Sequence, residues 1–155
     1  MNEAWQLSDL RRRLANIVRP GVIDQLDTGN ARVRVRAGEV LTGWLPWMTT
    51  RAMNDRSWWA PEPGEQVIVL SPSGELTNGY VLPAVFQQEA PPPASSKTTH
   101  AVEYADGTRV SHDRAASAYS VEVPAGGRIT LKVGGSSLVI DDSGIRLSAP
   151  RIDLN

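Results

Sequence analysis

Residues 119–155 read YSVEVPAGGRITLKVGGSSLVIDDSGIRLSAPRIDLN, a stretch in which short apolar and polar alternations recur between turn residues. Within each alternation the apolar residues are two positions apart, which is the period of a β-strand with one apolar face. The alternations are separated by segments rich in Gly, Ser, Asp and Pro, the residues that turns favour. The stretch therefore predicts a series of short strands that continues to the last residue.

These strands carry too few apolar residues to build a globular core. The five Trp residues lie within the first 59 positions and Phe86 is the single Phe of the sequence, so the large side chains precede the tail. Three chains wound around a common axis would bury the apolar faces against one another, and we predict such a trimeric, intertwined β-helix. The alternative is an antiparallel meander packed on the preceding domain. The residues expected to pack at the trimer axis are Val121, Ile129, Leu131, Val133, Leu138, Ile140, Ile145, Leu147, Ile152 and Leu154.

Composition argues against several kinds of site. The 155 residues include 16 basic and 17 acidic residues, with no long run of either sign, which argues against a nucleic-acid-binding surface. The absence of cysteine excludes disulfides, thiolate metal sites and cysteine nucleophiles. The N-terminus has no signal-peptide pattern and no stretch approaches the length of a membrane span, so we expect synthesis as a soluble cytoplasmic protein.

The N-terminal residues predict an amphipathic helix of about three turns within residues 1–20. Its apolar positions recur at helical spacing and are Leu7, Leu10, Leu14, Ile17 and Val18. The Pro20-Gly21 pair is expected to end the helix. Arg11, Arg12 and Arg13 are expected to form a solvated face with no catalytic role.

Residues 21–88 have the pattern of a small β-barrel. Val33 and Val35 alternate with arginines after a turn at residues 27–30, which predicts a β-hairpin. Further short strands are predicted within residues 40–48, 67–70 and 79–86, and Pro83 marks the last one as an edge or a bulge. About five short strands separated by Gly and Pro turns suit a barrel of the OB type.

Four tryptophans, Trp44, Trp47, Trp58 and Trp59, cluster in this barrel sequence and allow two interpretations. Exposed aromatic residues of an OB barrel can stack on nucleic-acid bases, with the arginines at positions 32, 34 and 36 beside them. We favour packing inside the barrel or at a subunit contact, because Trp is the largest side chain available for a small core and the chain is not basic.

The sequence divides into four segments. A helix in residues 1–20 and a barrel in residues 21–88 are followed by a stiff Pro/Ser-rich linker at 89–98. Residues 99–155 form the predicted needle, which opens with a hairpin in which Val102 and Tyr104 alternate before the turn at Asp106-Gly107. The predicted fold is all-β with one short helix.

Several motifs of the barrel occur in a specific order: Gly43-Trp44-Leu45-Pro46-Trp47, Ser57-Trp58-Trp59-Ala60-Pro61, Pro63-Gly64-Glu65-Gln66-Val67 and Gly79-Tyr80-Val81-Leu82-Pro83. In these motifs, in the helix before them and in the turn after the linker, the chain resembles the baseplate assembly protein V family of contractile-tail phages. Members of that family, like the related R-type pyocin and type VI secretion spikes, form trimers with an N-terminal OB domain and a C-terminal intertwined β-helix.

The resemblance implies a non-enzymatic central spike at the tip of a tail tube, driven through the target cell's outer membrane when the sheath contracts. It implies a homotrimer that contacts the baseplate hub and tail tube, with no small-molecule substrate and no nucleic acid as partner. It also implies synthesis in the producing cell's cytoplasm and assembly into the baseplate of a phage or pyocin tail.

The C-terminal sequence departs from that family in one respect. Phage relatives often end in a His-x-His motif whose three copies bind iron, whereas this chain ends in Arg151-Ile152-Asp153-Leu154-Asn155. Its two histidines, His100 and His112, lie near the start of the tail, so we predict no apical metal and no cofactor. We expect Ile152 and Leu154 to close the apex by packing.

Other functional classes lead to different expectations. A nucleic-acid-binding OB protein with a β-structured oligomerisation tail is the alternative to the spike. An enzyme would need a cleft domain with paired carboxylates, and we expect no catalytic residues because barrel, linker and needle occupy the whole sequence. A receptor-binding fibre would need a globular head after the needle.

Overall fold

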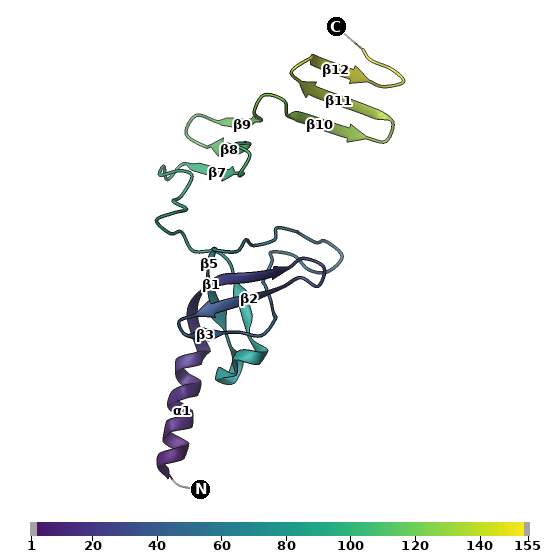
Figure 1. Ribbon diagram of the computed structural model, residues 1–155. Coiled ribbons are helices and arrows are strands. Elements are labelled where there is room, and N and C mark those ends of the chain that lie inside the picture. Colours follow the sequence, from purple (N-terminus) through teal and green to yellow (C-terminus); the bar gives the residue numbers. More distant parts are fainter. Residues whose placement is uncertain (1–2, 154–155) are drawn as a thin grey trace. The chain divides into compact units, whose positions relative to one another are not determined.

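The computed structural model describes residues 3–153, and the chain divides into two compact units, residues 1–91 and 92–155 (Figure 1). The first unit begins with helix α1, Glu3–Ile17, which is longer than predicted. The prediction that Pro20-Gly21 ends this helix is wrong, because both residues lie within strand β1, Val18–Asp27. Strand pairing ends the helix instead, since β1 pairs with β5 from its first residue, Val18. Gly21 is required at its position because a Cβ atom there would lie 2.5 Å from a methyl carbon of Val35.

The remainder of the first unit is a barrel of short strands. They are β1, β2 (Arg32–Ala37), β3 (Val40–Leu41), β4 (Leu45–Pro46), β5 (Gln66–Leu70) and β6 (Tyr80–Leu82). In the described residues their order is β3-β2-β1-β5-β6, with β4 also paired to β2. The residues after β4 close the barrel, because Trp47 forms a parallel bridge with Val81 and the Met48 amide donates to the Val81 carbonyl at 2.8 Å.

Two predicted elements of the barrel differ from the structure. The last strand, expected within residues 79–86, covers Tyr80–Leu82 alone and leaves Pro83 outside it. The turn expected after β5 contains two short 3-10 helices, Pro72–Gly74 and Leu76–Asn78. The second hairpin strand, by contrast, has the predicted alternation of inward and outward residues.

The barrel core is aliphatic. Its buried side chains alternate along the strands and are Ile23, Val33, Val35, Leu45, Val67, Val69 and Val81. Tryptophan does not fill this core: Trp47 packs against it, and Trp44, Trp58 and Trp59 are 46%, 64% and 64% exposed. Packing inside the barrel is therefore wrong for these three tryptophans, and the alternative of a subunit contact stays a prediction. The core of this small barrel is filled by Ile, Val and Leu side chains.

The second unit contains two antiparallel meanders within the described residues. The first comprises β7 (Thr99–Glu103), β8 (Arg109–Asp113) and β9 (Ala118–Glu122). The second comprises β10 (Arg128–Val133), β11 (Ser136–Asp141) and β12 (Gly144–Ser148). The strand predicted around Ile152 does not form, because residues 149–153 pair with no other strand in the described part of the chain. Leu154 lies outside the described residues.

Candidate trimer interface

One face of the β10–β12 meander is apolar except at Ser136, which lies opposite Val133. Ile129 lies opposite Ile140, and Leu131 lies opposite Leu138. Residues directly opposite each other in an antiparallel sheet project from the same face. The pairs of β11 with β12 continue these two rows, so seven of the predicted axis residues share the face: Ile129, Leu131, Val133, Leu138, Ile140, Ile145 and Leu147. This set is called the needle face below.

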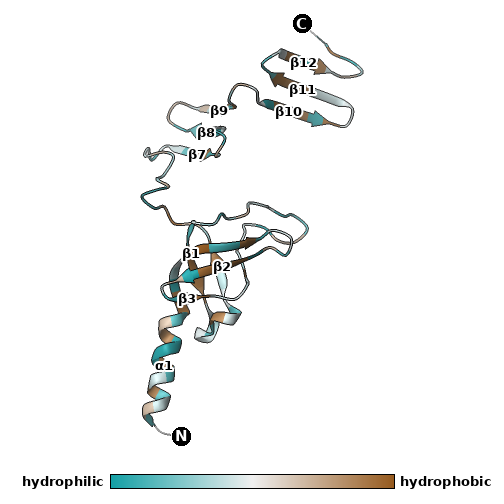
Figure 2. Ribbon diagram, in the orientation of Figure 1, coloured by the Kyte–Doolittle hydropathy of each residue, from teal (hydrophilic) through white to brown (hydrophobic). Residues whose placement is uncertain are grey.

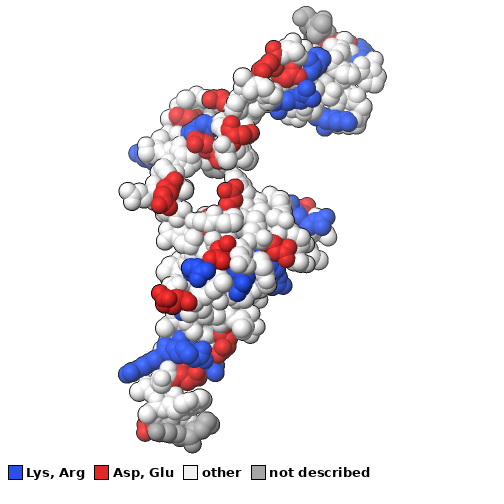
Figure 3. Space-filling model, in the orientation of Figure 1, with Lys and Arg blue, Asp and Glu red and all other residues white. Residues whose placement is uncertain are grey.

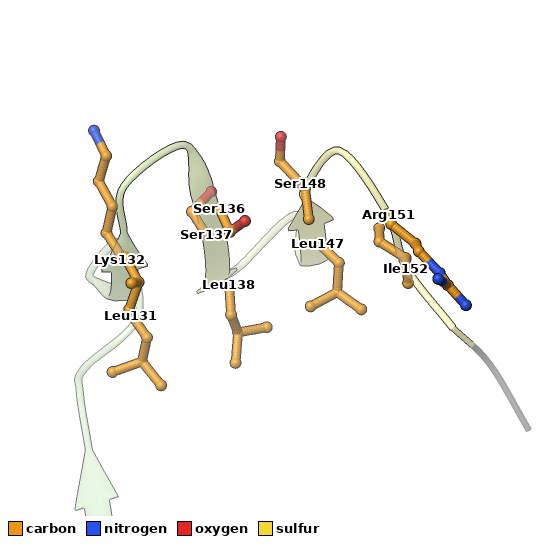
Figure 4. Close-up of a pocket in the computed structure, with 11 residues that line it drawn as sticks. Leu131, Lys132, Ser136, Ser137, Leu138, Leu147, Ser148, Arg151 and Ile152 are labelled. Atoms are coloured by element: carbon orange, nitrogen blue, oxygen red, sulfur yellow. The ribbon is translucent and has the colours of Figure 1, made fainter.

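The needle face is uncovered in a single chain. Val133 is 83% exposed, Ile145 69% and Leu131 62%. Figure 4 shows the side chains of Leu131, Leu138 and Leu147 pointing in the same direction and lining a shallow pocket, with Ile152 also on its wall. A contiguous exposed apolar surface of this kind marks an interaction site.

The opposite face of the same meander is polar and carries a charge network centred on Asp141. Its carboxylate accepts hydrogen bonds from the Arg146 guanidinium and from the Ser143 amide, the latter at 3.0 Å. Arg128 lies 3.3 Å from the same carboxylate. The hydrogen bonds from Arg146 and Ser143 hold the pKa of Asp141 well below its usual range, so the group stays ionised. Figure 2 shows that apolar and polar residues alternate along the β10–β12 meander.

The β7–β9 meander also has an apolar row and a more polar opposite face. Val102, Val110 and Val121 lie opposite one another across its three strands. Of these three, Val121 was predicted from the sequence and the other two were missed, although the alternation around Val102 is a strand signal. The opposite face carries Arg109, which donates to Glu103 at 2.9 Å and to the Pro93 carbonyl at 3.2 Å.

Two segments of the chain match known protein families, one in each of the two compact units. Residues 100–155 match the β-helical trimerization domain of Gp138, and residues 19–86 match the type VI secretion system/phage-baseplate injector OB domain. The spike protein of Escherichia phage P2 is 36% identical to this chain over 139 residues. That alignment covers 86% of this chain and 66% of the phage P2 protein.

The chain belongs to the phage baseplate spike family. Membership of the baseplate spike family confirms the resemblance and the fold class predicted from the sequence, an OB domain followed by a β-helical trimerization domain. The trimerization match begins at residue 100, so it includes the β7–β8 hairpin as well as the needle face. The whole second meander and the row through Val121 therefore lie in the segment that matches a trimerization domain.

The two histidines of this spike-family chain lie opposite each other, His100 on β7 and His112 on β8. His112 also lies beside Tyr119, with 6.4 Å between the ring centroids. Among residues 3–153 of one chain, no group of three or more His, Asp or Glu side chains is placed to hold a metal ion. Of the two positions predicted to close the apex, Ile152 lies outside any strand and lines the pocket of the needle face, and Leu154 lies outside the described residues.

The barrel surface of this spike-family chain carries charges of both signs (Figure 3). Two of the three arginines considered as base-contacting residues have partners within the barrel: Arg36 pairs with Asp24 at 2.7 Å, and Arg34 donates to the Thr42 carbonyl at 2.9 Å. The Arg34 guanidinium also lies 6.0 Å from the centre of the Trp44 ring. No helix in the described residues combines the length and apolar character needed to cross a membrane.

Proposed function

We propose that this protein is the central, non-enzymatic spike of a contractile tail, a homotrimer that breaches the target cell's outer membrane when the sheath contracts. The observation that carries the proposal is the needle face, an exposed apolar surface inside the segment that matches a trimerization domain. The tail belongs to a phage or an R-type pyocin particle.

Burial explains why the needle requires three chains. Ordering one residue costs about 1–2 kcal/mol, so ordering the six residues of β10 costs about 6–12 kcal/mol. Fully burying an Ile, Leu or Val side chain stabilises by about 1.5–3 kcal/mol. Burying the three apolar side chains of β10 therefore contributes about 5–9 kcal/mol, most of its ordering cost, when another surface covers them. Two further copies of the needle face supply that surface.

A mechanical role follows from the same architecture. Inside one chain β11 is paired on both sides, whereas β10 and β12 each have one open edge within the described residues. Neighbouring chains can cover these edges in the trimer, which leaves few unpaired backbone groups to fray under load. A needle built in this way is narrow and rigid, as a piercing point must be.

The ionisable groups support a non-enzymatic role. The described carboxyl groups with displaced pKa values all have them lowered, mainly by hydrogen bonds to the charged form: Asp9, Asp27, Asp106, Asp113 and Asp141. A general acid requires the opposite displacement, towards a pKa near the working pH. These carboxylates are suited to capping turns and pairing with arginine.

The barrel is proposed to attach the spike to the baseplate hub and the tail tube. Its surface exposes Trp44 and Trp58, and exposed aromatic side chains are the residues that most often anchor protein interfaces. The needle then extends towards the target membrane, and no small-molecule or nucleic-acid partner is required.

The test uses the purified full-length chain and the assembled particle. We expect light scattering to give the mass of a trimer and electron microscopy to show one elongated particle. Particles carrying an Ile140→Lys spike should lose killing or infection, whereas particles carrying Thr130→Lys should retain it. A folded monomer, or hydrolysis of peptidoglycan by the pure protein that is abolished by changing one acidic residue, would overturn the proposal.

A further inference from the structure

Helix α1 carries an apolar stripe that the barrel does not cover. Its residues are spaced by three, four and three positions and are Leu7, Leu10, Leu14 and Ile17, with exposures of 50%, 54%, 59% and 41%. Amphipathic helices of globular domains normally bury such a stripe against their own core. Here the stripe is exposed although the helix belongs to the same compact unit as the barrel.

The barrel holds the other side of α1. Arg12 and Arg13 both bond to Asp9 and reach the carboxylate of Glu75, at 3.2 Å and 3.7 Å respectively. The backbones also meet closely: a Cβ atom at Gly74 would lie 2.2 Å from the Arg13 carbonyl oxygen. At 100° per residue these attachment positions are on a different side of the helix from the leucines. The orientation of α1 is therefore fixed with the stripe turned away from the barrel.

We propose that this stripe is the seam of a parallel three-stranded coiled coil formed by the α1 helices of the three copies in the trimer. The spacing assigns Leu7 and Leu14 to heptad position a, and Leu10 and Ile17 to position d. Leu at a followed by Ile at d, as in the second heptad, favours three or four strands over two. The proposal rests on the trimer of the proposed function, which supplies two further helices pointing in the same direction.

The charges beside the seam are compatible with this arrangement. In a parallel coil, position g of one helix faces position e of the next heptad in its neighbour, which places Gln6 opposite Arg11. Arg13 also takes position g, but the residue five positions later, Val18, begins strand β1 and is not part of the helix. The seam therefore brings no like charges together through these contacts. Arg13 in addition keeps its bond to Asp9, at 2.7 Å, on its own helix.

Helix length explains why the coil depends on the remainder of the protein. A helix of 15 residues is at the lower limit of independent stability, and two heptads alone form a weak coiled coil. Trimerization through residues 100–155 makes the association of the helices intramolecular, with an effective concentration in the millimolar range. The barrel attachment adds to this by ordering each helix before association.

Cysteine cross-linking in the full-length protein tests the coil, since the native sequence contains no cysteine. Leu10→Cys places a thiol on the seam, and the matched control Ala15→Cys places one on an exposed position away from it. We expect disulfide-linked chains to form about tenfold or more faster in Leu10→Cys than in the control, because thiols at a seam position meet inside the coil whereas thiols at position 15 face away from it. We also expect Leu14→Lys to reduce the helical circular dichroism signal while Ala15→Lys leaves it unchanged.

The outcomes separate the two proposals. The coiled coil is overturned if the protein is a trimer, Leu10→Cys cross-links no faster than Ala15→Cys, and Leu14→Lys leaves the helical signal intact. That result leaves the proposed spike trimer unaffected. A wild-type protein with the mass of a monomer overturns both.

Discussion

Ile140 on β11 lies directly opposite Ile129 on β10, and both project from the needle face. The same strand of the meander alternates Ile140 with Val139 and Asp141, which project from the opposite, polar face. A charge introduced at Ile140 would therefore enter the layer that the trimer buries, and threefold symmetry would introduce it three times.

We expect Ile140→Lys to abolish the trimer or to lower its thermal midpoint strongly. Truncating a buried Ile costs about 2–5 kcal/mol per site, and a buried unpaired charge adds to that cost. Thr130→Lys is the control, because Thr130 is exposed on the polar face. The measurements are mass by light scattering and unfolding by circular dichroism. An Ile140→Lys protein as stable and as trimeric as the control would show that the needle face is not the axis.

We expect low pH to reduce the stability of the second unit, because Asp141 becomes protonated. Because the folded-state pKa of Asp141 is lowered by the hydrogen bonds from Arg146 and Ser143, its contribution to stability is present at neutral pH. That contribution is lost as the pH falls below the ordinary carboxyl pKa of about 4 towards the lowered folded value.

Asp141→Asn should therefore lower the thermal midpoint at pH 7, and the difference from the wild type should shrink below about pH 4. Asp153→Asn is a suitable comparison, because Asp153 is 67% exposed and pairs with Arg151, two residues away. Thermal unfolding across this pH range checks the prediction. A difference between Asp141→Asn and the wild type that is constant with pH would argue against it.

Gly74 should be required for the attachment of α1 to the barrel. It has a φ of +72°, and a Cβ atom there would meet the backbone of Arg13. Gly64 has a φ of +95°, and a Cβ atom there would have no neighbour within 4 Å, so Gly64→Ala reports the backbone strain alone, about 1–3 kcal/mol. We expect Gly74→Ala to lower the unfolding temperature more than Gly64→Ala does, and to reduce the helical signal. Equal effects of the two changes would mean that the contact between Gly74 and helix α1 contributes little to the stability of the protein.

The nucleic-acid alternative makes a distinct prediction. Arg34 and Arg36 already bond to the Thr42 carbonyl and to Asp24, so we expect single-stranded oligonucleotides to bind weakly or not at all. Fluorescence anisotropy at several salt concentrations measures this. Tight, strongly salt-dependent binding that is lost in Arg34→Ala and Arg36→Ala would favour the alternative.

The apex should hold no histidine-bound metal. Elemental analysis of the purified trimer is expected to find no stoichiometric iron. One iron per trimer that is lost when His100 and His112 are both replaced would contradict the absence of a histidine-bound metal. One iron per trimer that persists in that variant would contradict the expected absence of iron and would indicate carboxylate or backbone ligands.

Local periodicity made much of the fold predictable. Val33 and Val35 are buried as their alternation with arginine indicates, and Ile129 and Ile140 share a face as their spacing in two neighbouring strands requires. In both cases the face from which a side chain projects follows from the two-residue period of a strand.

The other features of the fold could not be predicted, because they depend on contacts between residues far apart in the sequence. Pro20 and Gly21 usually end helices, but here strand pairing with β5 determines the backbone on both sides of them. The tryptophans are the largest apolar side chains, yet Ile, Val and Leu side chains fill the barrel core, and Trp58 remains 64% exposed. Val110 was missed as a candidate interface residue because its membership of an apolar row depends on the register with β7 and β9.

The pairing in the meanders also determines which folding step depends on protein concentration. β10 pairs with β11 and β11 with β12, so every such hydrogen bond joins strands that follow each other in the chain. Hairpins of this kind form in about 1–10 μs without any partner molecule. Strand register can therefore be set inside each chain, and the collision of three needle faces is the step whose rate rises with concentration. A cell that produces little of this protein would thus be limited in spike assembly by encounter between chains rather than by strand pairing inside each one.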